Sequence, residues 1–212
     1  MNLTERSILL CTIIIFCMFL LILFPCKNIF ILNLGIDINQ DLQTISKQYI
    51  VEHKNTALPE DMNKWLRQWD FVTIIQNPID RIVADITNNN FASKYNLNKF
   101  INSIQFDEEM EKCYRGNLSH CWSNYYTLSL IGETDVLVQD SYRLSLQKLE
   151  KFKCVVIDKL WNKTSGCLPV NVKYPQLKPT YTNYLSSRSL KKLEIMNEYD
   201  IIIYNYLVNK YK

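Results

Sequence analysis

The stretch Asp70-Phe71-Val72-Thr73-Ile74-Ile75-Gln76-Asn77-Pro78 decides the fold. Every residue from Phe71 to Ile75 is aromatic or β-branched, which predicts a short buried strand. Gln76 and Asn77 end this strand, and Pro78 suits the first turn of a helix that extends to about Thr87. A strand, a tight turn and a helix N-terminus form the local architecture at which α/β proteins bind phosphate groups.

Upstream of this stretch the sequence predicts further strands and helices. Residues 29–38 are apolar and β-prone, with a break at Gly35. Residues 41–51 predict a short helix that leads into a strand. Residues 59–69 predict a helix, because Pro59 suits its first turn and large apolar side chains recur at helical spacing.

Downstream, residues 88–102 are polar and predict a loop or a broken helix, and residues 136–152 predict a helix. Cys154-Val155-Val156-Ile157 predicts a second buried strand. Residues 165–187 predict an irregular stretch. One long amphipathic helix should end the chain, capped by Ser187 or Ser189. Strands separated by helices predict an α/β fold with a parallel sheet.

Residues 7–26 contain no charged side chain and consist mostly of Leu, Ile, Phe, Met and Cys. A membrane-spanning helix needs about 20 apolar residues, and this run meets that length. A cleaved signal peptide has a shorter apolar core that small residues follow, whereas here Phe24-Pro25-Cys26 follows a long core. We therefore expect an uncleaved signal-anchor after a cytoplasmic tail of residues 1–6.

Two glycosylation sequons and five cysteines lie beyond the apolar core. Asn117 and Asn162 each begin an Asn-x-Ser/Thr triplet, so both are candidate glycosylation sites on the C-terminal side of the anchor. In a lumenal domain Cys113 could pair with Cys121, and Cys154 with Cys167, each pair closing a short loop. The alternative is buried free thiols in a cytosolic domain.

Composition narrows the classes of ligand. The 212 residues allow one domain plus an anchor, and the net charge of +3 is too small to argue for nucleic-acid binding. A weakly basic domain is still compatible with a polyanionic ligand. A metal site is not expected, because no Cys-x-x-Cys spacing occurs and His53 and His120 are the two histidines.

The central stretch resembles the donor-binding motif of the carbohydrate sulfotransferases. In that family a strand leads into Arg-Asp-Pro-x-x-Arg-x-x-Ser, which binds the 3'-phosphate of the sulfate donor. Pro78 and Arg81 stand in place here, whereas Gln76 replaces the first Arg, Asn77 the Asp and Ala84 the Ser. The family's Lys-x-x-x-Thr-type loop for the 5'-phosphosulfate has no counterpart in the sequence.

Three further stretches resemble the family in the same order. Residues 124–132 resemble its Asn-x-Gln-x-Arg-x-Leu run, with Tyr126 and Leu128 in place of the Gln and the Arg. Residues 144–157 resemble the helix and strand that follow that run. The C-terminal Asn-x-x-Asp-x-x-x-Tyr-x-Tyr pattern is matched by Asn197, Asp200, Tyr204 and Tyr206. The likeness runs from about Val51 to the C-terminus and is closest to the heparan sulfate 2-O- and 6-O-sulfotransferases.

This resemblance implies a P-loop-like sulfotransferase fold, incomplete at its N-terminal side unless residues 29–34 supply the first strand. It implies PAPS (3'-phosphoadenylyl sulfate) as the sulfonate donor and a glycosaminoglycan or related glycan as the acceptor. Arg81, Gln76 and Asn77 are then the donor-binding residues, and His53 is the general base. Without the resemblance, His53 is equally a surface histidine, and Arg81 an exposed helix residue that pairs with Asp85.

The resemblance also implies an organisation and a location. Residues 27–50 are a stem or a partial first βα unit, and residues 51–212 form the lumenal domain of a single-pass type II Golgi membrane protein. Three interpretations of function stay open: a sulfotransferase, a catalytically inactive relative that binds a glycan or a protein partner, and an unrelated membrane-tethered interaction domain.

Overall fold

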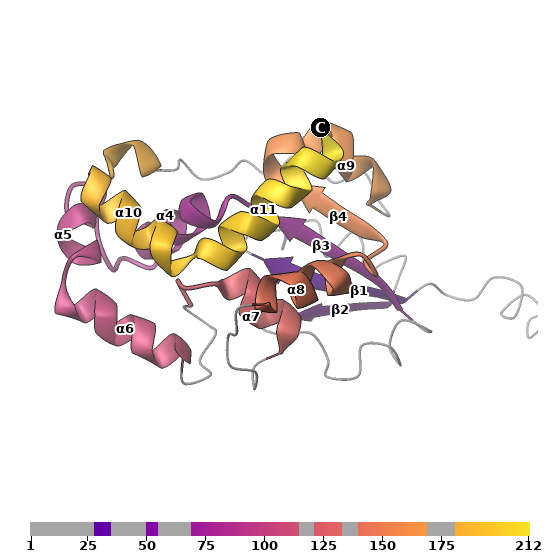
Figure 1. Ribbon diagram of the computed structural model, residues 1–212, viewed down its shortest axis with the longest axis horizontal. Coiled ribbons are helices and arrows are strands. Elements are labelled where there is room, and N and C mark those ends of the chain that lie inside the picture. The colour runs from indigo at the N-terminus through magenta and orange to yellow at the C-terminus, as the bar shows by residue number, and fades with distance from the viewer. Residues whose placement is uncertain (1–27, 35–49, 55–68, 115–120, 133–139, 169–180) are drawn as a thin grey trace, which may run out of the picture.

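The computed structural model describes residues 28–34, 50–54, 69–114, 121–132, 140–168 and 181–212 (Figure 1). It is an α/β fold built on a parallel sheet with strand order β2-β1-β3-β4. The strands are β1 (Asn28–Leu34), β2 (Ile50–Lys54), β3 (Trp69–Ile75) and β4 (Cys154–Ile157). β3 pairs in parallel with β1 on one side and β4 on the other, which confirms the predicted central strand.

In the N-terminal half, one expected element is confirmed and one differs. Asn28–Leu34, within the β-prone stretch, is an inner strand of the sheet, and residues 35–49, which follow it, lie outside the described residues. Trp69 begins β3 instead of ending a helix. The rest of that helix, residues 59–68, and the helix expected from residue 41 lie outside the described residues.

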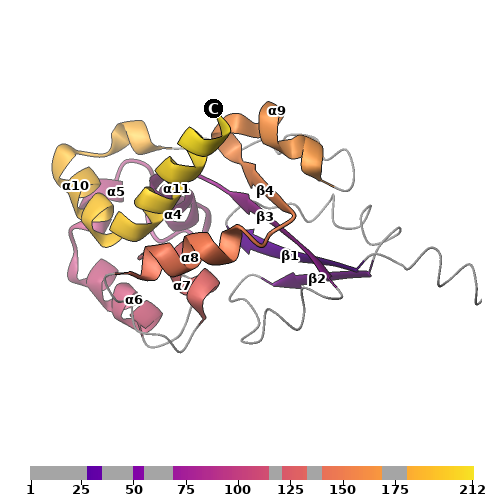
Figure 2. The ribbon, with the colours of Figure 1, turned by 45° about the vertical axis from the view of Figure 1, so that its right-hand side comes forward.

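Helices flank the sheet and gather beyond one end of it. Figures 1 and 2 show α5, α6 and α10 beyond the end toward which the strand arrowheads point, while α7, α8 and α11 lie together along the sheet. The described helices are α4 (Pro78–Asn88), α5 (Leu97–Ile101), α6 (Ile104–Tyr114), α7 (Tyr125–Ile131), α8 (Ser141–Leu149), α9 (Trp161–Thr164), α10 (Ser187–Met196) and α11 (Glu198–Tyr211), with 3₁₀ turns η2 (Asp158–Leu160), η3 (Ser165–Cys167) and η4 (Thr182–Tyr184).

An aromatic cluster fixes the end formed by α5 and α6. The indole of Trp122 is fully buried, and its ring centroid lies 5.0 Å from that of Phe91, 5.8 Å from Phe100 and 5.3 Å from Phe106. Ring pairs at such separations add about 0.5–1.5 kcal/mol each beyond the area that they bury. The polar residues 88–102, expected to be a loop or a broken helix, thus contain α5 and a buried ring.

The expectation of one long C-terminal helix is wrong, because α10 ends at Met196 and a separate helix, α11, begins at Glu198. Asn197 interrupts it: its side-chain amide donates to the Trp122 and Leu193 carbonyls at 2.8 and 2.9 Å. The N-cap is also one residue earlier than expected, since the Ser186 hydroxyl accepts from the Ser189 amide.

The structure describes one of the two expected disulfides, whereas the expected membrane anchor lies outside the described residues. Cys154 and Cys167 form the expected disulfide, which ties the start of β4 to η3. Cys121 is disulfide-bonded too, but the side chain of its expected partner Cys113 lies outside the described residues. No helix within the described ranges is long and apolar enough to cross a bilayer, and residues 7–26 lie outside those ranges.

Candidate functional site

The candidate site lies where the strand order reverses. β2 lies on one side of β1 and β3 on the other, so the carboxyl ends of β1 and β3 flank the point of reversal. In open parallel sheets, ligands bind in the crevice outside the carboxyl ends at such a point. We call the residues that follow β3 here, with the rings that cover them, the carboxyl-edge site: Gln76, Asn77, Arg81, Tyr125 and Tyr126.

Asn77 is the N-cap of α4. Its side-chain oxygen accepts from the amides of Ile79 (2.9 Å) and Asp80 (3.3 Å), and its own amide donates to a carboxylate oxygen of Asp158 at 3.0 Å. Pro78 occupies the first helical position and carries no N–H. The helix N-terminus that should offer amides to a phosphate is therefore largely satisfied by the protein itself.

Arg81 is buried and is not the exposed, Asp85-paired residue of the alternative interpretation. Its side chain is 7% exposed, and one terminal nitrogen donates to the Cys121 carbonyl at 3.0 Å. The guanidinium carbon lies 4.6 Å from the ring centroid of Tyr125 and 5.6 Å from that of Tyr126. Asp85 accepts hydrogen bonds from Trp122 and Asn89 instead. The Arg81 Nε is buried with no hydrogen-bond partner among the described residues.

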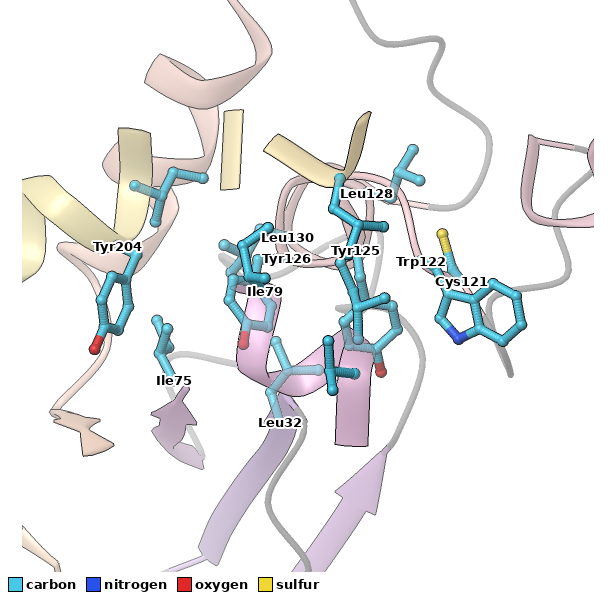
Figure 3. Packing of buried hydrophobic residues seen from close by; sticks show 14 of the residues in the cluster. Leu32, Ile75, Ile79, Cys121, Trp122, Tyr125, Tyr126, Leu128, Leu130 and Tyr204 are labelled. Carbon is cyan, nitrogen blue, oxygen red and sulfur yellow. The ribbon is translucent and has the colours of Figure 1, made fainter. Parts of the chain in front are cut away.

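Tyr126 ties the end of β3 to α7. Its hydroxyl donates to the Gln76 carbonyl at 2.6 Å, and the Gln76 residue is only 4% exposed. Figure 3 shows Tyr125 and Tyr126 among Leu32, Ile79 and Leu130, which belong to the same core. Burial raises the pKa of Tyr125 and raises that of Tyr126 well above its usual value, so both phenols stay neutral.

Asp200 closes the site from α11. It is fully buried and accepts from the amides of Tyr126 (2.8 Å) and Thr127 (2.9 Å) and from the Thr127 hydroxyl (2.8 Å). It thereby caps the N-terminus of α7, where Asn124 adopts a left-handed conformation with φ 44°. Burial raises the pKa of this carboxyl, although the hydrogen bonds and the charge of Arg81 oppose the shift.

The capping is reciprocal between α7 and α11. The Asn124 side-chain oxygen accepts from the amides of Tyr199 (3.0 Å) and Asp200 (3.3 Å) at the start of α11. In return, the Asn124 amide donates to the Asn197 side chain at 2.9 Å. The two stretches that resemble sulfotransferase motifs around residues 124 and 197 are therefore brought into direct contact.

Asp158 was not expected from the sequence, although it directly follows a predicted buried strand. Its carboxylate joins three elements, because it accepts from the Asn77 amide at α4 and from the Tyr204 hydroxyl (2.7 Å) at α11. A cavity of about 510 Å³ is lined by Asp158 and the five residues after it. The carboxyl end of β4 thus carries a hollow beside the carboxyl-edge site.

The register separates His53 from the carboxyl-edge site. His53 pairs with Ile31 on β1, and Ile31 pairs with Val72 on β3. Since a strand rises about 3.3 Å per residue, the level of His53 lies about 13 Å short of Gln76 along the sheet. β2 is also two strands away from β3. The backbone therefore brings Gln76, Asn77 and Arg81 together but leaves His53 apart.

The structure describes one of the two expected glycosylation sites. Asn162 is exposed on α9, and the Thr164 hydroxyl of its sequon donates to the Leu160 carbonyl. Asn117 lies outside the described residues. Within the described ranges, no three His, Cys, Asp or Glu side chains are grouped to hold a metal ion.

No protein-family model, curated protein or solved structure matches the chain.

Proposed function

We propose that the chain is a membrane-anchored protein of the carbohydrate sulfotransferase family. In this account the carboxyl-edge site descends from a donor site that transferred a sulfonate from PAPS to a hydroxyl of a glycosaminoglycan or related glycan. The Golgi lumen is the proposed location, with residues 7–26 as the anchor.

One observation carries the proposal. Three stretches that resemble family motifs, distant from one another in the sequence, meet where the strand order reverses. Arg81 donates to the carbonyl of Cys121, just before the second stretch, and Tyr126 of that stretch donates to Gln76 of the first. Asp200 of the third stretch caps the helix that carries Tyr126. This is the position at which a parallel α/β sheet binds its ligand.

The present residues fit PAPS poorly. A phosphate at a helix N-terminus needs free amides and cations, but Asn77 occupies two α4 amides and Tyr125 and Tyr126 cover Arg81. Ala84 offers no hydroxyl, and the backbone of His53 is distant. These observations favour the second candidate function, a catalytically inactive relative that binds a glycan or a partner.

Transfer of labelled sulfate from PAPS to heparan sulfate by the full chain in detergent separates the two candidates. We expect transfer at the background level. Transfer at an ordinary enzymatic rate, abolished by His53→Ala, would establish an active enzyme. A rate unchanged by His53→Ala but abolished by Arg81→Ala would establish activity with a different base.

A further inference from the structure

Two stretches of the chain carry positive charge and no negative charge. Residues 92–106 and 181–193 contain five Lys and Arg residues and no Asp or Glu. The remaining chain has 19 basic and 21 acidic residues, so its formal charge is −2, whereas the whole chain is +3. The two stretches together therefore carry a formal charge of +5, and we call them the basic lobe. The acidic residues of α6 begin directly after the first stretch, at Asp107.

Hydrogen bonds hold the two stretches side by side. The Asn98 side-chain amide donates to the Tyr184 carbonyl at 2.8 Å, and that of Asn102 donates to the Ser189 hydroxyl at 2.8 Å. Lys192 donates to the Ile101 carbonyl at 2.9 Å. Figures 1 and 2 both show α5 and α10 together at one end of the molecule.

Four cations of the basic lobe have no ion pair with a described residue. Lys192 is neutralised by Asp107 at 2.6 Å, but no such pair involves Lys94, Lys99, Arg188 or Lys191. Lys99, Arg188 and Lys191 are exposed. Unpaired cations gathered on one part of a surface create the potential that attracts a polyanion.

Exposed tyrosines stand among these cations. The Lys94 ammonium lies 4.9, 5.9 and 5.7 Å from the ring centroids of Tyr95, Tyr181 and Tyr184. Tyr95 is 78% exposed and Tyr184 is 49% exposed, which is unusual for such large rings. Exposed tyrosines provide flat apolar surface with a polar tip, as binding surfaces commonly do.

The basic lobe adjoins the carboxyl-edge site. The Thr182 hydroxyl, next to Tyr181, donates to the Asp80 carboxylate in the first turn of α4. Asp80 also donates its amide to the Asn77 cap. A long ligand lying on the basic lobe would therefore reach the edge of the sheet at which the strand order reverses.

We infer that the basic lobe is a binding site for an acidic polysaccharide, whose sulfate or carboxylate groups pair with Lys99, Arg188 and Lys191 while its sugar rings pack on Tyr95 and Tyr184. The Cys154–Cys167 disulfide favours a polysaccharide over other polyanions. Disulfides persist in oxidising compartments, and a domain in such a compartment is separated from nucleic acids and from the anionic cytoplasmic leaflet of the membrane. The inference rests on the proposed function only in naming the glycan class, and it requires neither donor binding nor catalysis.

Heparin binding by the full chain in detergent, measured on a heparin-coated sensor in about 0.15 M NaCl, tests the inference. We expect the triple variant Lys99→Ala, Arg188→Ala and Lys191→Ala to weaken binding at least tenfold. The slope of log affinity against log salt should become shallower by about two to three, as expected for lost ionic contacts. Desulfated heparin should bind the unmodified chain far more weakly than heparin does.

The matched control also removes three positive charges, but from residues outside the basic lobe. Lys151→Ala, Lys210→Ala and Lys212→Ala alter three exposed cations outside the basic lobe and should leave affinity within about twofold. Equal losses in both triple variants, or no loss in the first, would overturn the inference. Tyr184→Ala should weaken binding several-fold, whereas Tyr211→Ala, at a ring 38% exposed, should not.

Further probes decide the ligand class and separate this inference from the proposed function. A single-stranded oligonucleotide or phosphatidylserine vesicles binding as tightly as heparin would overturn the assignment to a polysaccharide. Failure of donor binding with heparin binding intact would count against the enzyme alone, and intact donor binding with no heparin binding would count against the basic lobe alone.

Discussion

At the scale of single residues, the two buried ionisable side chains of Arg81 and Asp200 are the main departure from an ordinary apolar core. Arg81 makes one hydrogen bond, to a carbonyl, and faces two tyrosine rings, while Asp200 accepts three hydrogen bonds from α7. Burying a charge is costly unless it is paired and hydrogen-bonded. Opposite charges in one core offset part of that cost and bind α4, α7 and α11 together.

Asp200→Ala should lower the free energy of unfolding by about 2–5 kcal/mol, because two buried amides and one hydroxyl lose their acceptor. Chemical denaturation followed by tryptophan fluorescence measures this loss. Asp107→Ala removes an exposed carboxylate that pairs with Lys192 and should cost less than about 1 kcal/mol. Equal costs at the two positions would refute the capping role of Asp200.

The raised pKa of Asp200 predicts how stability changes with pH. The unfolded chain loses this proton near pH 3.8, whereas the folded chain retains it to a higher pH, so the contribution of Asp200 to stability is lost as the pH rises through the folded pKa. Asp200→Asn removes this titration. The free energy of unfolding of the unmodified chain should therefore fall relative to the variant as the pH rises from 3.8. A relative rise over that range would show that the folded pKa is lowered instead.

At the scale of elements, the turn between β3 and α4 combines a strand end with a tightly closed helix start. Asn77→Ala should destabilise the protein by about 1 kcal/mol, because the Ile79 and Asp80 amides lose their cap. Asn89→Ala, at the other end of α4, removes one exposed side-chain bond and should have little effect. Urea denaturation of both variants measures the difference. An Asn77 variant as stable as the unmodified chain would instead leave this side chain available for ligand binding.

Elements whose residue pattern is local could be predicted from the sequence. Element boundaries that depend on contacts with residues distant in the sequence could not. β3 and β4 are short β-branched runs that bury both faces, so the sequence alone locates them. The break at Asn197 depends on Trp122 and Asn124, which lie more than 70 positions away. The helical periodicity runs through Asn197 without interruption, and for that reason one helix was expected where two occur.

At the scale of the whole molecule, the strand order brings the candidate residues together, and no local pattern contains that information. Arg81 stands out in its motif, but its burial under Tyr125 follows from how α7 packs on α4. Asp158 could have been suspected, since it follows a buried strand at the same edge. The separation of His53 follows from the register of β2, which sequence spacing cannot supply.

The proposed lumenal location predicts glycosylation of the domain. Expression in animal cells followed by endoglycosidase treatment should increase the mobility of the chain, and Asn162→Gln should remove one step of that shift because Asn162 is exposed on α9. Asn117→Gln should remove a second step. The double variant serves as the control that lacks both glycans. A chain whose mobility the enzyme leaves unchanged would contradict the proposed orientation.

The central claim is that the carboxyl-edge site is a degenerate sulfotransferase donor site, and calorimetric titration with adenosine 3',5'-bisphosphate tests it most directly. We expect weak or undetectable binding to the unmodified chain. Gln76→Arg with Ala84→Ser should tighten binding at least tenfold, because each regained charge-assisted contact contributes about 1.5–3 kcal/mol. Adding Arg81→Ala to that variant should abolish the gain, with thermal unfolding as the check on folding. If the doubly substituted chain folds and still binds no nucleotide, or binds it equally well without Arg81, the claim is contradicted.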